Sequence, residues 1–260
     1  MKNISYLILF LLGIQPCFAQ SGSSSKTFAV KAFKQPVLSG ESSNPIIRLS
    51  INAEQLNLKA LTGTLGTVSI GNIKRIAVYD TDSVAKFTDQ KMIGSVVPKN
   101  QQFSIPLNTT IAPGKHYLWL SIELNENVSI KEKLQLELQY LITKAGIKYK
   151  FDRNKNTFYL GSTVRKHGDD QVNTYRIPGI ATTNSGALIS VYDIRYLNSR
   201  DLPGHVDVGM SKSVDGGKTW QAMKIIMDMG EPHENNGVGD PAVLFDPATN
   251  TIFVVALWSK

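Results

Sequence analysis

The octet at residues 213–220 places the tightest constraint on how this chain can fold. It has the form Ser-x-Asp-x-Gly-x-Thr-Trp. We expect the Asp215 carboxylate to accept hydrogen bonds from backbone N–H groups of its own turn, and the two glycines that follow to supply the positive φ of a tight hairpin. A calcium loop is the alternative, but Gly217 stands where an EF-hand loop needs Asp or Asn. The octet is therefore interpreted as a structural turn, with Thr219 and Trp220 beginning the outgoing strand and Trp220 covering the edge of the sheet.

Short strand-like segments surround this turn. Candidate strands lie at residues 177–182, 187–192, 206–210 and 220–226, and two more follow at 242–245 and 252–257. Four antiparallel strands form one blade of a β-propeller. Residues 165–260 are therefore predicted to contain a first blade and the beginning of a second.

The N-terminal half is also rich in strand patterns. Apolar residues at 47, 49, 51 and 53 alternate with polar ones, which is the period-two pattern of a half-buried strand. Further apolar runs, separated by Gly, Pro, Asn and Asp, lie at 67–70, 75–79, 102–107, 117–124 and 134–142. Such closely spaced strands predict an antiparallel β-sandwich over residues 27–150. The one candidate helix covers residues 54–61.

The tetrapeptide Tyr-Arg-Ile-Pro at residues 175–178 stands ahead of the octet. Together the two motifs resemble the start of the catalytic domain of bacterial exo-sialidases, a family in which the octet pattern is called an Asp-box. The resemblance implies an all-β fold, with an N-terminal antiparallel β-sandwich followed by the first blade or two of a six-bladed β-propeller. It divides the chain into a signal peptide at 1–19, an accessory sandwich at 27–150 and the start of the propeller at 165–260. The Asp-box residues would be structural; they are Ser213, Asp215, Gly217, Thr219 and Trp220.

The predicted sandwich resembles the accessory domain that precedes the propeller in bacterial sialidases. This likeness rests on position and strand pattern over about residues 27–150. Such a domain could bind carbohydrate, or it could be a spacer that buries one face against the propeller. The spacer is favoured, because the strand pattern reveals no aromatic platform.

The resemblance also implies a substrate-binding arginine and an acid/base aspartate. Arg176 falls where the family places the first of three arginines that hold the carboxylate of sialic acid, and a guanidinium suits this role because it binds carboxylates bidentately and stays charged. Apolar neighbours such as Pro178 predict a largely buried setting for Arg176. Asp201 falls on the loop after the second strand of the blade, where the family places its general acid/base, a group that needs a raised pKa. The alternatives are a surface arginine and a solvated loop carboxylate.

Two more residues match family positions around the sugar. Arg195 and Asp240 correspond to residues near the 4-hydroxyl and N-acetyl groups of the substrate. The alternative is a mutual or surface ion pair of little energetic value. Trp258 could line an N-acetyl pocket, although a core position is favoured. Asp207 and His205 are expected to be structural.

The family's tyrosine nucleophile, its assisting glutamate and two carboxylate-binding arginines have no recognisable counterpart here. Six blades need roughly 300 or more residues. The sequence is therefore expected to be the N-terminal part of a retaining exo-α-sialidase that acts on sialylated glycans, and to be inactive by itself. A non-catalytic glycan-binding propeller or sandwich module is the alternative. A different propeller hydrolase, in which Arg176 and Asp201 match by coincidence, is a third.

Charge and the N-terminal residues complete the expectations. The formal net charge is +7, and a positive surface suits an anionic substrate. The basic residues are scattered along the sequence, which argues against nucleic-acid binding. The N-terminal residues predict a signal peptide cleaved after Ala19, and hence an exported protein. They contain the positive charge of Lys2, then an apolar run too short to span a membrane, and then small residues before position 20. Cys17 is the single cysteine, so the mature chain would lack disulfides. The four histidines lack ligand spacing, and no metal or cofactor is expected.

Overall fold

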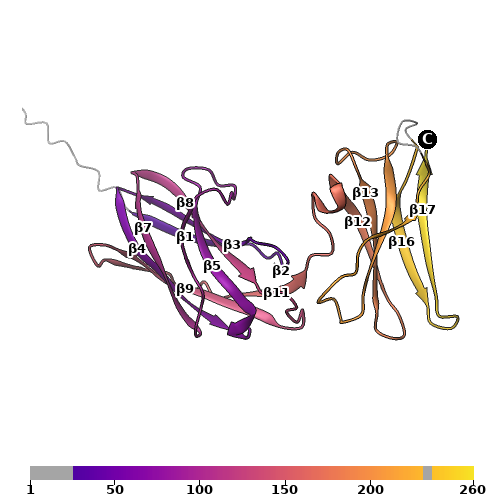
Figure 1. The fold of residues 1–260 in the computed structure, drawn as a ribbon. Helices are drawn as coiled ribbons and strands as arrows, with labels where there is room; N and C mark the ends of the chain where they lie inside the picture. The colour runs from indigo at the N-terminus through magenta and orange to yellow at the C-terminus, as the bar shows by residue number, and fades with distance from the viewer. Residues whose placement is uncertain (1–25, 231–235) are drawn as a thin grey trace, which may run out of the picture.

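A computed structural model describes residues 26–230 and 236–260 (Figure 1). The regular secondary structure of the described chain is β-strand, as predicted, apart from two single 3₁₀ turns, η1 (Ile70–Asn72) and η2 (Asp169–Gln171). The predicted signal peptide at 1–19 lies outside the described residues and stays a prediction.

The N-terminal part contains two facing sheets. One has the strand order β1-β3-β8-β5-β6, and the other has the order β2-β11-β9-β4-β7 with β10 paired to β9. Among the described pairings of these sheets, β2 with β11 is parallel and the others are antiparallel. The strands are β1 (Thr27–Ala32), β2 (Val37–Ser39), β3 (Asn44–Ala53), β4 (Leu56–Gly66), β5 (Ile73–Asp80), β6 (Met92–Val96), β7 (Gln102–Ile111), β8 (Gly114–Leu124), β9 (Lys133–Thr143), β10 (Lys148–Lys150) and β11 (Asn156–Ser162).

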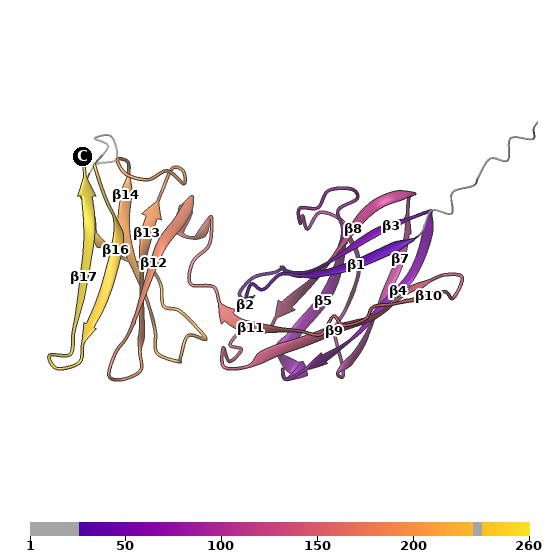
Figure 2. The same cartoon turned by 180° about the vertical axis from the view of Figure 1, so that it is seen from behind.

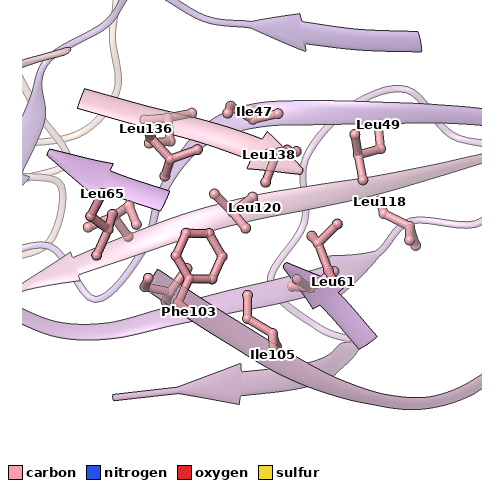
Figure 3. Packing of buried hydrophobic residues seen from close by; sticks show 14 of the residues in the cluster. Ile47, Leu49, Leu61, Leu65, Phe103, Ile105, Leu118, Leu120, Leu136 and Leu138 are labelled. Atoms are coloured by element: carbon pink, nitrogen blue, oxygen red, sulfur yellow. The ribbon is translucent and has the colours of Figure 1, made fainter. Parts of the chain in front are cut away.

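A large apolar core lies between these sheets. Alternate residues of each strand point inward, as in β7, where every second side chain from Phe103 to Leu107 is buried. Burying a side chain of this size stabilises the fold by about 1.5–3 kcal/mol. Figure 3 shows Ile47, Leu49, Leu118 and Leu120 of one sheet packed against Leu61, Leu65, Phe103, Ile105, Leu136 and Leu138 of the other.

Two local expectations in this part were wrong. Residues 56–66 form strand β4 rather than a helix, because buried Leu56 and Leu58 alternate with exposed polar neighbours, a spacing of two that suits the sandwich core. The strand expected at 67–70 does not form. Thr67 has a φ of 63°, and the chain turns there into η1.

The C-terminal part begins with a four-stranded antiparallel sheet, β12-β13-β14-β15. Its strands are β12 (Thr174–Thr182), β13 (Leu188–Arg195), β14 (Val206–Ser213) and β15 (Lys224–Met227). A hairpin of β16 (Gly237–Asp246) and β17 (Thr251–Ser259) follows and lies beside this sheet (Figures 1 and 2). Val191 and Val208 of the sheet pack against Val238 and Val254 of the hairpin. Four strands followed by a hairpin is the arrangement predicted for one blade and the start of a second.

The turn at 213–220 differs from expectation in one respect. The outgoing strand begins at Lys224 rather than at Thr219 or Trp220. Trp220 is instead half-buried against the connection that leads from β11, where its Nε1 donates a hydrogen bond to Ser162 Oγ at 2.9 Å, and Ser162 Oγ donates in turn to Gly217 O. Trp220 therefore ties the C-terminal sheet to the segment that leaves the sandwich.

Candidate active site

The hydrogen bonds of the Asp-box turn match its predicted structural role. Asp215 Oδ1 accepts from the backbone N–H groups of Lys218 and Thr219, each at 3.0 Å, and from Ser213 Oγ at 2.8 Å. Gly217 has a φ of 85° and donates its N–H to Ser213 Oγ. The hydrogen bonds from Thr219, followed by those from Ser213 and Lys218, hold the pKa of Asp215 well below its usual range. The carboxylate thus closes the turn as an acceptor.

We expect Asp215→Ala to lower the thermal unfolding midpoint of the 260-residue chain by a few degrees at pH 7. Because the pKa is lowered in the folded state, the stabilisation is fully present above the unfolded pKa of about 3.9 and is lost as the pH falls through the folded value. The gap between wild type and variant should therefore narrow below about pH 4. Asp152→Ala, which removes only an exposed pair with Lys150, is the control, and equal midpoints for both variants at pH 7 would contradict the role.

Three of the predicted site residues meet at the end of β13. Asp201, on the loop between β13 and β14, places its Oδ1 2.7 Å from Arg195 Nη1 and 3.2 Å from Arg176 Nη1. Both Nη1 atoms also donate to the carbonyl oxygen of Ser199, at 3.0 and 3.2 Å. The Asp201 side chain is 74% exposed and that of Arg176 is 42% exposed. The structure therefore brings together two cations and a carboxylate, and of these three side chains Asp201 and Arg176 are the ones that ligands from solvent can reach.

The setting of Arg176 is not the buried one that its apolar neighbours predicted. Strand β12 is at the edge of its sheet, where it pairs with β13 on one side. Its register shifts between Arg176 and Gly179, and Ile177 has a φ of 51°, which is unusual for a β-branched residue. Pro178, which has no N–H for the ladder, fits such an irregularity. The bulge ends regular pairing beside Arg176, and bulges of this kind re-aim side chains next to functional sites.

Arg195 is deeply buried, with 2% of its side chain exposed. Its Nε and Nη2 donate to Asp193 Oδ2 at 3.0 and 2.7 Å, and its Nη1 donates to Arg200 O as well as to the Asp201 loop contacts given above. Contact with a substrate would require one of these donors to be freed. In this structure Arg195 anchors the Asp201 loop, and its predicted contact with the sugar stays a prediction.

Asp193 is the residue of this site that the sequence analysis missed. Its side chain is 1% exposed, and burial raises its pKa despite the opposing hydrogen bonds from Arg195 and the backbone of Asp240. Oδ1 accepts the Asp240 N–H at 2.8 Å. The available signal was the spacing of Asp193 and Arg195, because residues two apart on a strand point to the same face.

Asp240 joins the site through its backbone. It lies where β16 shifts register between Gly239 and Ala242, it has a φ of 53°, and it is exposed. Its N–H is fixed by Asp193. The carboxylate is therefore attached to an ordered backbone, as a predicted sugar contact requires.

The electrostatics of Asp201 differ from those of a general acid at rest. The hydrogen bond and charge of Arg195, and then the charge of Arg176, lower the pKa of Asp201. A raised pKa was expected for Asp201 from its predicted role as the acid. The difference arises because both arginines face the carboxylate when no substrate is bound.

Residues near this cluster have mixed outcomes. A pocket of about 180 Å³ is lined by Asp201, Arg200 and His205 among others. His205 stacks on Tyr196, whose hydroxyl donates to buried Asp207 at 2.8 Å, and such packing suits the structural role expected for His205 and Asp207. Trp258 is 55% exposed, so the favoured core position was wrong.

The sandwich has one group of possible metal ligands, made of Asp80, Asp82 and His116. Lys91 Nζ lies 2.8 Å from Asp80 Oδ2 and 3.0 Å from Asp82 Oδ1. This ammonium already lies between the two carboxylates and pairs with both, so we assign no metal here. Asp80 belongs to β5 and His116 to the adjacent strand β8, so the spacing of the histidines in the sequence could not reveal this group.

The outer face of the sandwich carries an aromatic cluster that was not evident from the sequence. Trp119 stacks on Phe33 with ring centroids 4.9 Å apart, and Phe87 packs edge-on against both Tyr79 and Trp119. Trp119 and Tyr79 are each only 5% exposed. A sugar needs an open ring face, so these two rings form a small satellite core rather than a platform.

Among the described residues, no helix is long and apolar enough to cross a membrane.

Comparisons with known proteins agree with this architecture. Residues 25–146 match the family model described as the N-terminal domain of BNR-repeat neuraminidase. A sialidase of Bacteroides fragilis is 34% identical over 97% of this chain and 53% of its own length, and a sialidase of Micromonospora viridifaciens is 30% identical over 39% of this chain and 16% of its own. The solved structure of the Hadza microbial sialidase Hz136 has 27% identity and a TM-score of 0.77 over 88% of this chain and 51% of that one. The chain thus spans about half the length, or less, of these relatives.

Proposed function

We propose that this chain, which has the sequence and fold of the N-terminal region of a bacterial sialidase, supplies part of an exo-α-sialidase active site. The enzyme would release terminal sialic acid from glycoconjugates by retaining hydrolysis. Asp201 would be the general acid/base, and Arg176 would bind the sialic acid carboxylate. The observation that carries the proposal is the meeting of Asp201 with Arg176 and Arg195 at an exposed position.

Binding of the substrate would change the charge balance at Asp201. The carboxylate of sialic acid is an anion, and its pairing with Arg176 would compete with the present contact between Arg176 and Asp201. The sugar would also exclude water from the exposed carboxyl group. A neighbouring anion and desolvation both raise the pKa of a carboxyl group. Substrate itself would thereby convert Asp201 from an ion-pair partner into an acid.

The reaction would use Asp201 twice. First, protonated Asp201 would give its proton to the glycosidic oxygen while the bond from that oxygen to the anomeric carbon of sialic acid breaks and a nucleophile bonds to that carbon. Second, the Asp201 carboxylate would accept a proton from the water that attacks the same carbon and displaces the nucleophile. The nucleophile between these steps would come from outside this sequence, since the family's tyrosine has no recognisable counterpart here.

An exposed apolar face on the C-terminal hairpin supports a longer functional unit. The side chains on this face are between 50% and 68% exposed and come from the paired strands β16 and β17; they are Leu244, Phe253, Val255 and Leu257. Their opposite-facing neighbours Val254 and Ala256 pack against the first sheet. An apolar face of this kind marks an interaction surface, and we propose that it stacks against a further blade of a propeller.

We expect the 260-residue chain alone to release no sialic acid, because one acid and one exposed arginine do not make a complete site. The full-length gene product, expressed from the reading frame read past Lys260, should be active. Free sialic acid would be measured after incubation with sialyllactose and with an aryl sialoside. Turnover by the purified 260-residue chain would overturn this expectation.

A non-catalytic glycan-binding protein is the alternative, and the lowered pKa of Asp201 favours it. A carboxylate held by two arginines can be a purely structural ion pair. A full-length product that binds sialyllactose but never cleaves it would select this alternative.

A further inference from the structure

We propose that Asp193 is a positioning residue. It joins the loop between β13 and β14 that carries Asp201 (residues 196–205, the acid loop) to the backbone of Asp240, and so fixes Asp201 relative to Asp240. This inference rests on the proposed function. Asp193 contacts neither solvent nor, by its burial, a substrate. It would act through Arg195 on one side and through Asp240 on the other.

The two carboxylate oxygens of Asp193 are used for different partners. Oδ2 takes the Nε and Nη2 donors of Arg195, and Oδ1 takes the N–H of Asp240. Arg195 then uses Nη1 to hold the acid loop at Ser199 O, Arg200 O and Asp201 Oδ1. A continuous set of hydrogen bonds therefore runs from β16 through β13 to Asp201.

Two glycines of β16 allow the strand to approach this set closely. A Cβ on Gly239 would lie 3.1 Å from Asp193 Oδ1, and a Cβ on Gly237 would lie 2.2 Å from Gly204 O on the acid loop. The acid loop thus also rests directly on β16. The positive φ of Asp240 shows that its backbone is held in an uncommon conformation, and the bond to Asp193 is the visible restraint.

The fixed placement of Asp201 has a chemical consequence. A general acid must lie within hydrogen-bond reach of the leaving oxygen, and small misplacements cost large factors in rate. The need for the acid depends on the leaving group. An aryl oxide leaves readily without a proton, whereas the alkoxide of lactose does not.

The first test follows hydrogen exchange in the 260-residue chain with Asp193→Asn. The asparagine keeps the shape but loses the charge, and its amide cannot accept both sets of donors. Peptides covering residues 197–205 and 237–241 should exchange faster than in wild type. Asp207→Asn is the matched control, because Asp207 is also buried on the adjacent strand but bonds Tyr196 instead. Unchanged exchange in both peptides would overturn the proposal.

The second test measures kcat/KM of the full-length product on sialyllactose and on an aryl sialoside. Asp193→Asn should lose roughly 10- to 100-fold more activity on sialyllactose than on the aryl substrate. A merely destabilising change would lower both equally, as expected for Asp207→Asn. In an Asp201→Asn background, Asp193→Asn should no longer alter the ratio of the two activities.

The outcomes separate this inference from the proposed function. If Asp201→Asn changes the ratio and Asp193→Asn does not, the positioning role is wrong and the enzyme proposal stands. If Asp201→Asn changes neither activity, the proposed acid is wrong. The exchange experiment then decides alone whether Asp193 couples the loop to β16.

Discussion

Replacing Asp201 by asparagine in the full-length product is expected to lower kcat/KM for sialyllactose by about 10²- to 10⁴-fold, the usual contribution of a general acid or base. The amide can still accept the hydrogen bond from Arg195, but it has no carboxylic proton to give to the glycosidic oxygen. Because the Asp201 side chain is 74% exposed, the substitution should leave the unfolding midpoint nearly unchanged. Initial rates of sialic acid release and a thermal melt measure the two effects.

The loss must be separated from a general effect of removing a negative charge. Asp246→Asn removes an exposed carboxylate from the last residue of β16, where it accepts hydrogen bonds from Thr249 and the Ala248 N–H. This control should retain the wild-type rate. Wild-type turnover in Asp201→Asn would exclude the acid role and leave Asp201 as the partner of two arginines.

The fold followed from the sequence because its signals are local. The alternation of apolar and polar residues in β3 and β7 and the turn chemistry of the Asp-box each depend on a few neighbouring residues. In the structure, β3 and β7 belong to the sandwich, and the Asp-box turn follows β14 of the four-stranded sheet. Leu56 and Leu58 were misleading because a short apolar run suits either a helix or a strand. Their partners on β7 and β9, far away in sequence, decided in favour of the strand.

The site was only partly predictable, because its contacts cross between strands. The sequence indicated Arg176, Arg195 and Asp201, and the structure brings all three together. Burial could not be read in the same way. Arg176 is exposed on edge strand β12, whereas Arg195 is buried with its guanidinium enclosed by Asp193 and the loop that carries Asp201. Asp193 was missed since its partner at Asp240 lies on another sheet.

Replacing Arg195 by methionine is expected to destabilise the C-terminal sheet by about 3–5 kcal/mol, the typical effect of breaking a buried ion pair from one side. Methionine replaces the apolar stem of arginine but leaves the Asp193 carboxylate, 1% exposed, without its cation. For a unit near 100 residues this corresponds to a fall of more than about 10 °C in Tm. Calorimetry of the 260-residue chain would measure it, with the sandwich transition as an internal reference because its core contains neither residue.

The origin of this effect can be isolated by removing the charge on the other side as well. In the double variant Asp193→Asn with Arg195→Met, no unpaired charge is buried, and the asparagine oxygen can still accept the Asp240 N–H. The double variant should therefore be more stable than Arg195→Met alone, since the unpaired carboxylate costs more than an unpaired amide. The stability of Arg195→Lys should lie between that of Arg195→Met and that of the wild type. The lysine keeps a cation beside Asp193, but one ammonium cannot replace a guanidinium that bonds Asp193 and the acid loop at once. If Arg195→Met unfolds at the wild-type temperature, the pair is open to water in solution, and neither the anchoring of the acid loop nor the positioning role of Asp193 can hold.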